Sequence, residues 1–341
     1  MAGYELASKK VQLQETDDPI EYYFEQGWTD GLPVVPPTAE KIGAFLDAVG
    51  RSPSEILGTE PVRGRVVTVE KVAINAVMAG CRPEYFRVVL ATMEAMLEPE
   101  HNLHAVTVST MGAAPLLVVN GPVANEIGLN SGVSVFGPGH RANATIGRAI
   151  RLTIMNVTGA VPGDLDQSSL GHAGKYTWCI AEDEETSPWQ ALHVDRGYAS
   201  SQSTVTVFPG LSPIQVTNSG GGSPEAALKG VADGMIVAGP SNAEIVVVLT
   251  PETIGHIKAG RWSKEQVTKH LWERSRLTAA QWDEHGYPTG NPDPDELVGV
   301  TTSWEGITVI VAGGKAGSFS AIIPLWGGGA NSRAVSKVIR S

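Results

Sequence analysis

The segment AVTVSTMGAAPLLVVNG occupies residues 105–121 and predicts two short buried strands with a glycine turn between them. Apolar and β-branched residues dominate it, as is typical of strands that are covered on both faces. The segment TVTVFPGLSPIQVTNSG, residues 204–220, repeats the order of a V-T-V run, a glycine, a proline and an asparagine. A looser third copy, GITVIVAGG, lies at residues 306–314. These segments predict a core built on β-strands.

Helical segments alternate with these strands. Thr38 and Thr68 predict helix N-caps, because a threonine hydroxyl accepts a hydrogen bond from the first helical turn. Ser263 and Gln266 predict a capping box. The helices that these residues begin are expected over residues 39–49, 69–79 and 264–275. The alternation predicts an α/β or α+β fold, with mixed sheets and glycine-rich strand–loop–helix units.

Two further segments resemble each other: GPGHRANATIGRAIR at residues 137–151 and GGGANSRAVSKVIR at residues 327–340. We interpret each as a glycine loop followed by a basic helix. The pairs suggest internal duplication in units of about 95 residues; the alternative is that all strand–glycine–helix junctions look alike. We expect a flexible arm over residues 1–20, a first lobe over 21–155 and a second over 156–341, or one domain continuous across both lobes.

The composition restricts the class of protein. The chain has 341 residues, of which 36 are acidic and 25 basic, so its net charge is −11 with histidine neutral. This negative charge disfavours non-specific binding to nucleic acid or to an anionic membrane. Hydrophobic residues make up 42%, too many for a charge-rich disordered chain. Apolar runs such as residues 245–249 fall far short of the ~20 residues that a membrane span needs.

The N-terminus and the cysteines bear on the compartment. The first residues, MAGYELASKK, lack the basic and apolar regions of a signal peptide. The chain has two cysteines, which suggests a reducing cytoplasm more than a secreted framework. We therefore expect a cytoplasmic protein. Charged residues make up only 18%, so we also expect the chain to bury more surface in a homo- or hetero-oligomer.

Cys81 is the first candidate catalytic residue. It lies in MAGCRPEYF, between the predicted end of one helix and the start of the next, and Arg82 follows it. A helix N-terminus and a neighbouring cation both stabilise a thiolate, so we expect a lowered thiol pKa. The alternative is a small residue that packs a corner between helices. Cys179, in a predicted strand, is expected to pack in the core.

The glycine loop before residue 141 predicts an anion-binding site. Glycines let the backbone approach a ligand, and a helix N-terminus presents unpaired N–H groups to a carboxylate or phosphate. The alternative is a tight turn whose basic residues are solvated. The expected binding residues are Gly137, Gly139, Arg141, Asn120, Asn130, Ser131 and Asn143 here, and Gly328, Gly329, Asn331 and Arg333 in the C-terminal loop.

The segment GHAGKYTW, residues 171–178, brings together His172, Lys175 and Tyr176. Imidazole and amine groups transfer protons, and a phenol can stabilise an oxyanion. An ordinary surface loop is the alternative. His104 and His140 are further candidates for proton transfer.

Other polar residues give weaker signals. His101 and His104 have the H-x-x-H spacing of metal ligands, but no third ligand stands at a recognisable spacing. We therefore predict no metal and no cofactor. Asp30, Asp164 and Asp166 are loop carboxylates that orient a histidine or act as bases, although most loop aspartates form turns.

Four long segments together resemble a largely uncharacterised bacterial family, which is associated with small thiol or selenol proteins that carry a UGSC motif. They are GWTDGLPVVPPT, INAVMAGCRPEYF, FGPGHRANATIGRAIRL and GKYTWCIAEDEE, at residues 27–38, 74–86, 136–152 and 174–185. The resemblance extends from residue 20 onwards. This chain has no UGSC motif, so the resemblance implies that the reactive thiol or selenol belongs to a separate partner protein. It implies no particular substrate.

Three functions follow from these residues. We expect an enzyme of the hydrolase or lyase type that acts on a small carboxylate or acyl-type anion through cysteine or acid/base chemistry. Cys81 would attack, a histidine would transfer protons, and Lys175 or Tyr176 would polarise a carbonyl. One alternative is a subunit of a thiol/selenol redox complex, in which Cys81 exchanges with the partner. The other is a non-catalytic protein that binds a small anion.

Overall fold

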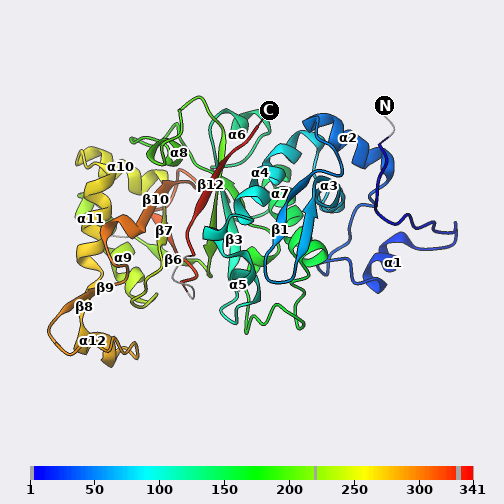
Figure 1. Ribbon diagram of the computed structural model, residues 1–341. Helices are drawn as coiled ribbons and strands as arrows, with labels where there is room; N and C mark the ends of the chain where they lie inside the picture. The colour runs from blue at the N-terminus through cyan, green and yellow to red at the C-terminus, as the bar shows by residue number, and fades with distance from the viewer. Residues whose placement is uncertain (1–3, 219–220, 328–331, 341) are drawn as a thin grey trace.

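The computed structural model describes residues 4–218, 221–327 and 332–340. Within them, two four-stranded mixed sheets pack face to face, and helices cover the outer face of each sheet (Figure 1). The protein therefore has four layers in the order helix, sheet, sheet, helix. The predicted α/β or α+β class with mixed sheets is confirmed.

The first sheet has the strand order β12–β5–β3–β4. Its central strands are antiparallel, and their register places Leu117 opposite Val207. β4 runs parallel to β3, and β12 runs antiparallel to β5. The bounds are β3 (Ala114–Asn120), β4 (Cys179–Ala181), β5 (Thr204–Gly210) and β12 (Val335–Val338).

The second sheet has the order β10–β7–β11–β6 and repeats the pairing pattern of the first. β10 runs parallel to β7, β11 runs antiparallel to β7, and β6 runs antiparallel to β11. The bounds are β6 (Ile214–Thr217), β7 (Ile245–Leu249), β10 (Ile307–Val311) and β11 (Phe319–Pro324). The matching patterns support an internal duplication in which β3 corresponds to β7.

The two sheets exchange their outer strands. β5 and β6 are consecutive along the chain but lie in different sheets, and so do β11 and β12. The two crossings meet where Gly210 bridges Leu325, and the amide of Trp326 donates to the carbonyl of Pro209 over 2.8 Å. The first sheet therefore takes strands from both sides of residue 155.

Two sequence expectations about these segments are wrong. Residues 105–108 belong to helix α5 (Leu103–Val108) rather than to a strand. Leu103 and Val106 are buried at helical spacing, and the hydroxyl of Thr107 donates back to the carbonyl of Leu103. The C-terminal segment forms β12 instead of a basic helix, because its backbone pairs with β5. The duplicated units therefore differ from the pairs of segments that the sequence suggested.

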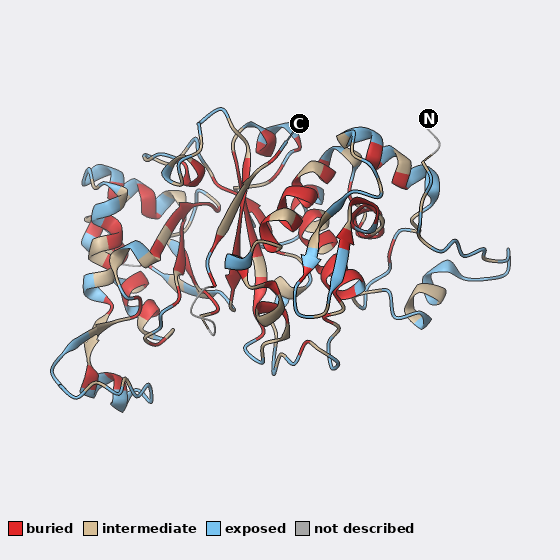
Figure 2. Ribbon diagram, viewed as in Figure 1, coloured by how far each residue is buried: buried red, intermediate tan, exposed pale blue. Residues whose placement is uncertain are grey.

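Alternation along the strands separates the layers. In β3, Leu116 and Val118 face the second sheet, while Leu117 and Val119 face the helices. All four side chains are buried, and full burial of such a side chain contributes about 1.5–3 kcal/mol. Figure 2 shows that burial is concentrated in the strands and in the inner faces of the helices.

Long helices cover both sheets. The first sheet is covered by α2 (Ala39–Val49), α3 (Val69–Met78), α4 (Phe86–Met96) and α7 (Arg141–Thr153), which continues into a π-helical turn, Ile154–Thr158. The second is covered by α9 (Pro224–Ile236), α10 (Pro251–Ala259) and α11 (Lys264–Arg274). The predicted caps are confirmed: Thr38 and Thr68 accept from the first turns of α2 and α3, and Ser263 and Gln266 form the capping box of α11.

Smaller elements surround these layers. They are the helices α1 (Pro19–Glu25), α6 (Pro122–Glu126), α8 (Leu192–Asp195) and α12 (Ala279–Glu284), the hairpin of β1 (Ile56–Glu60) with β2 (Arg65–Thr68), the pair β8 (Arg276–Thr278) and β9 (Leu297–Gly299), and four 3-10 turns (Pro83–Tyr85, Pro99–His101, Ala173–Lys175, Trp304–Gly306). The arm before α1 is held in part, because the amides of Ala7 and Ser8 donate to the buried carboxylate of Glu70.

Among the described residues, no helix has the length and apolar character needed to cross a bilayer.

Candidate functional site

Four polar residues meet beside the amino end of β4. We call Arg151, Asp166, Ser168 and Lys175 the Lys175 cluster. The Lys175 amine lies 2.7 Å from Asp166 Oδ2 and donates to Ser168 Oγ over 2.6 Å. Arg151 Nη2 lies 3.1 Å from the same Asp166 oxygen, and the Ser168 hydroxyl donates to Asp166 Oδ1 over 2.5 Å. The cluster joins the end of α7, the loop after its π-helical turn and the 3-10 turn before β4.

The charges of the Lys175 cluster do not balance. The Asp166 side chain is only 1% exposed and is the one carboxylate of the cluster, whereas Arg151 and Lys175 are both cations. Burial acts to raise the pKa of Asp166, but hydrogen bonds from Lys175 and Ser168 outweigh it and leave that pKa below its ordinary value. Burial lowers the pKa of Lys175 despite the opposing hydrogen bond to Asp166. The cluster therefore favours an added anion or the loss of the lysine proton.

His172 lies next to this cluster. Its Nδ1 accepts from the amide of Gly174 over 3.2 Å, and its ring stands edge-on to Trp178 with centroids 5.1 Å apart. Burial lowers the pKa of His172, and the positive charge of Lys175 adds to this against the opposing carbonyl of Gly210. A neutral imidazole, able to take up or release a proton, thus lies near the lysine.

The loop that carries Ser168 is partly exposed. Ser168 is half-buried, and Leu170, two residues later, is 98% exposed. The amide of Ser169 donates to the carbonyl of Thr110 over 2.9 Å, which places the exposed Met111 beside this loop. Tyr176 is also exposed, so the predicted trio of His172, Lys175 and Tyr176 is not a single buried triad. Two exposed apolar side chains, Leu170 and Met111, therefore lie in the loops near Ser168.

The glycine loop before α7 has the predicted form. Gly137, Gly139 and His140 are exposed, and α7 begins at Arg141. The guanidinium of Arg141, however, donates to the carbonyl of Gly80 over 3.1 and 2.9 Å. Arg141, which was expected to supply positive charge to the anion site, therefore fixes α7 to the end of α3.

The neighbouring polar residues also bind the chain itself. Asn143 is buried and exchanges hydrogen bonds of 2.8 and 2.9 Å with the backbone of Asn130. The side chain of Asn130 bonds to Gly132 and Val133, and the carbonyl of Ser131 accepts from Gly313. Their polar groups stabilise the loop between α6 and α7.

The C-terminal loop is described only in part. Gly328, Gly329 and Asn331 lie outside the described residues. Arg333 is exposed, its amide donates to the carbonyl of Glu100 over 2.7 Å, and its guanidinium donates to the carbonyl of Ser332.

The expectation of a low thiol pKa at Cys81 is wrong. Cys81 is 7% exposed, and its thiol donates to the carbonyl of Thr145 over 3.2 Å. Burial raises the pKa of Cys81 to about 12, because it removes the water that stabilises a thiolate and outweighs the charge of Arg141. Cys179 packs in the core as expected, and burial raises its pKa too.

The histidines after α4 lie in other surroundings. His101 is fully buried, and burial lowers its pKa to about 4. His104 lies in helix α5, not at the start of a strand, and its Nδ1 is 3.2 Å from a carboxylate oxygen of Glu60. Over the described ranges, no three histidine, cysteine, aspartate or glutamate side chains are grouped to hold a metal ion.

The loop aspartates have different roles. The Asp30 side chain is buried and accepts two hydrogen bonds, of 2.7 and 2.8 Å, from Arg148 of α7, so it fixes the N-terminal loop to that helix. Asp164 is exposed, whereas Asp166 anchors Lys175.

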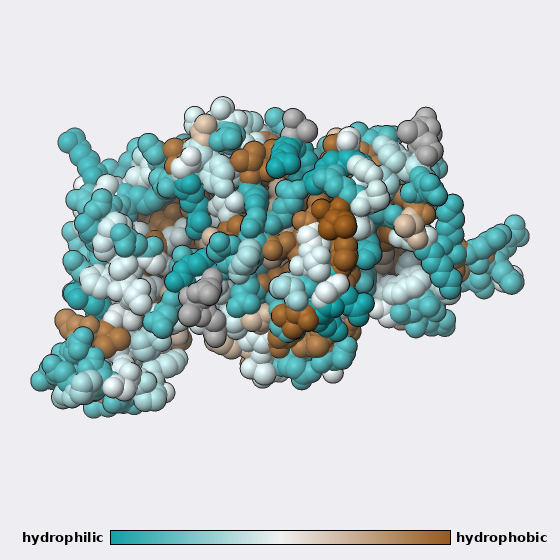
Figure 3. All heavy atoms as spheres, viewed as in Figure 1, coloured by the Kyte–Doolittle hydropathy of each residue, from teal (hydrophilic) through white to brown (hydrophobic). Residues whose placement is uncertain are grey.

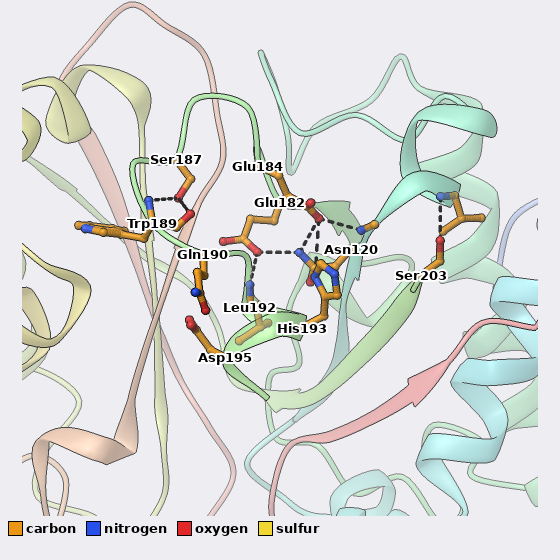
Figure 4. Close-up of polar contacts among 12 residues, drawn as sticks. Asn120, Glu182, Glu184, Ser187, Trp189, Gln190, Leu192, His193, Asp195 and Ser203 are labelled. Atoms are coloured by element: carbon orange, nitrogen blue, oxygen red, sulfur yellow. Dashed lines mark hydrogen bonds and ion pairs between the residues drawn. The ribbon is translucent and has the colours of Figure 1, made fainter. Parts of the chain in front are cut away.

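Sequence reasoning missed a second polar centre, which Figure 4 shows at the other end of β3 and β4. Because these strands are parallel, Asn120 and Glu182 lie at the same sheet edge, where open α/β sheets commonly bind ligands. The Asn120 side-chain amide donates to Glu182 over 2.6 Å and to Glu184 over 2.9 Å (Figure 4). We call these residues, with His193, the Glu182 cluster.

The Glu182 cluster is acidic. Burial raises the pKa of Glu182, while Glu184 remains exposed. Buried His193 lies with its Nδ1 4.0 Å from Glu184. The amide of Asn120, expected to bind an anion, is occupied by two carboxyl groups. That Asn120 ends one strand and Glu182 directly follows another was readable from the sequence, but the parallel pairing that joins these strands was not.

Comparisons of the chain with protein families, with curated proteins and with solved structures found no match. The Lys175 cluster has two cations for one carboxylate and a half-buried serine, whereas the Glu182 cluster has two carboxyl groups, of which Glu182 is buried and Glu184 exposed. The Lys175 cluster is the better candidate for an anionic substrate.

Proposed function

We propose that the protein is a hydrolase that acts on a small acyl-type anion at the Lys175 cluster. The observation that carries the proposal is the 2.6 Å distance between the Lys175 amine and the Ser168 hydroxyl oxygen. In the structure the amine donates to Ser168, whose hydroxyl donates to Asp166. Once Lys175 is neutral and the serine hydroxyl turns from Asp166 towards it, the amine at this distance accepts the serine proton, and serine–lysine pairs serve in this way in hydrolases of unrelated folds. Burial lowers the pKa of Lys175, and this increases the fraction of Lys175 that is neutral at a given pH.

The chemistry follows from these groups. Ser168 Oγ attacks the substrate carbonyl carbon while its proton passes to Lys175 Nζ. The leaving group takes that proton as its bond to the carbonyl carbon breaks, which leaves an ester on Ser168. Water then attacks the ester, gives a proton to Lys175 and releases the acid, and the serine recovers its proton. Asp166, itself held by Arg151, positions the lysine, and neutral His172 is a second proton carrier near the site.

The surroundings of Ser168 favour a particular substrate class. While Lys175 is protonated, two cations face one carboxylate, which favours binding of a substrate that carries a negative charge. When Lys175 has lost its proton and acts as the base, this surplus charge is gone. Leu170 and Met111 are exposed apolar side chains in the loops near Ser168. We therefore propose a carboxylate-bearing ester, thioester or amide of small size.

Hydrolysis of a chromogenic ester with a free carboxylate, mono-p-nitrophenyl glutarate, tests the proposal. We expect Ser168→Ala to abolish turnover and Ser169→Ala, one residue away and exposed, to leave it unchanged. Equal turnover of Ser168→Ala and the parent chain, both folded by circular dichroism, would remove Ser168 from the mechanism.

The other expectations have uneven support. The thiol/selenol redox role receives less support, because burial of Cys81 opposes the exposed thiolate that exchange needs. A cytoplasmic location remains our proposal, supported by two cysteines that are unbonded among the described residues. Exposed apolar side chains such as Val133 and Leu170 support assembly with a second copy or with a partner.

A further inference from the structure

A hollow of about 440 Å³ lies at the outer edge of the first sheet. β12 forms one wall, the C-terminal half of α4 another, and β1 a third. This volume falls within the range of sites for small organic ligands, about 300–1,000 Å³. The lining residues are Arg51, Ile56, Leu57, Glu94, Glu98, Tyr198, Lys337, Val338 and Arg340. The hollow is separate from the Lys175 cluster, because β12 and β4 are the two opposite edges of the sheet.

Most charges that line the hollow are paired. Arg51 donates to Glu55 and to Glu94, both over distances of 3.0 Å or less. Lys337 donates to Glu98. These pairs fix the walls and leave little net charge on them.

Arg340 differs from the other cations. Within the described part of the chain, it is exposed and has no hydrogen bond to a carboxylate, although its charge helps to lower the pKa of Glu55. It also borders a smaller adjoining hollow of about 40 Å³, which Arg51 and Arg87 line as well. Its guanidinium is thus available to an oxyanion, to which arginine donates two parallel hydrogen bonds.

An apolar surface lies beside Arg340. Ile56 is 61% exposed, and Leu57 and Val338 complete the apolar part of the wall. Figure 3 shows apolar surface over the β1–β2 hairpin, in a face that is otherwise mostly hydrophilic. Covering an exposed apolar side chain with the apolar part of a ligand is favourable, because it removes apolar surface from water.

We propose that this hollow binds a small organic anion, with its phosphate or carboxylate group on Arg340 and its apolar body on Ile56, Leu57 and Val338. Phosphate and carboxylate share the chemistry that a guanidinium recognises. The site is a second ligand site, and no residue of the proposed hydrolytic mechanism lines it.

Titration calorimetry with phenyl phosphate and phenylacetate tests the proposal. We expect saturable binding of at least one of them, and the tighter ligand identifies the oxyanion. Benzylamine, which has the same ring with a positive charge, should not bind. Arg340→Gln should weaken binding about tenfold or more, as expected for a lost charge-assisted hydrogen bond.

Two further variants complete the test. Ile56→Ser should weaken binding of the aromatic anions but not that of inorganic phosphate. Arg274→Gln, an equal loss of charge at an exposed position on α11, should change nothing. The proposal is overturned if neither aromatic anion binds, if benzylamine binds equally, or if Arg340→Gln binds as the parent chain does.

Discussion

The Lys175 amine lies 2.6 Å from the Ser168 hydroxyl oxygen, and both groups contact the same buried carboxylate of Asp166. Asp166 is held in turn by Arg151. Lys175, the proposed proton acceptor, thus lies beside the proposed nucleophile Ser168, and Asp166 holds both side chains in place.

Replacement of Lys175 should abolish most of the hydrolysis. Lys175→Met keeps the length of the side chain but removes the base, so kcat should fall by about 10²–10⁴-fold. Lys175→Arg keeps the charge but cannot give up its proton near neutral pH, so it should be as inactive as Lys175→Met. An active Lys175→Arg variant would show that lysine supplies only charge.

The rate should rise with pH. The neutral amine is the active form of Lys175, and burial lowers the pKa of Lys175 below its ordinary value of 10.5. The midpoint of the pH–rate profile should therefore lie below pH 10.5. Asp166→Asn removes a charge that favours the protonated amine, so the midpoint should move to lower pH, while Asp164→Asn in the same loop should not move it. A profile that falls with pH would contradict the assignment.

Glu182 should make the protein less stable as pH rises. Because burial raises the pKa of Glu182 above its unfolded value near 4.5, its contribution is fully present below that value and is lost as pH rises through the folded pKa. Glu182→Gln should remove this dependence, so urea unfolding should show less stability lost as pH rises above 4.5. The exposed Glu185→Gln is the control, and a variant that keeps the parent pH dependence would exclude Glu182 as its source.

Cys81 should behave as a packing residue. Iodoacetamide should leave it unmodified in the native protein and alkylate it after unfolding, because its thiol is buried and its pKa is raised to about 12. Cys81→Ala should retain turnover and lose about 0.5–1.5 kcal/mol of stability, as for removal of one buried methylene-sized group. Rapid alkylation of the folded protein would favour the redox role.

Local signals in the sequence predicted the local structure. Thr38, Thr68 and the Ser263–Gln266 pair begin helices as expected, because a cap depends only on residues within one turn. The strand at residues 114–120 was equally clear from its apolar run. The V-T-V run at 106–108 was misleading, since its β-branched residues favour a strand while burial of Leu103 and Val106 favours a helix.

Features that depend on distant contacts were not predictable in this way. No pattern in residues 204–217 indicates that β5 and β6 enter different sheets, because strand pairing is set by the whole core. Lys175 was identified from its residue type, but Ser168 and Arg151 join it only through the path of the intervening loop. The pKa of Cys81 was mispredicted for the same reason, since packing around it outweighs its place between two helices.

The central claim is that Ser168 becomes acylated with the help of Lys175. Rapid quenching of the protein with mono-p-nitrophenyl glutarate, followed by peptide mass spectrometry, tests this claim most directly. The account predicts a glutaryl group on the peptide that contains Ser168, present in the Ser169→Ala variant and absent from Lys175→Met. Turnover of the ester with an acyl group on a different residue, or with none on Ser168, would contradict it.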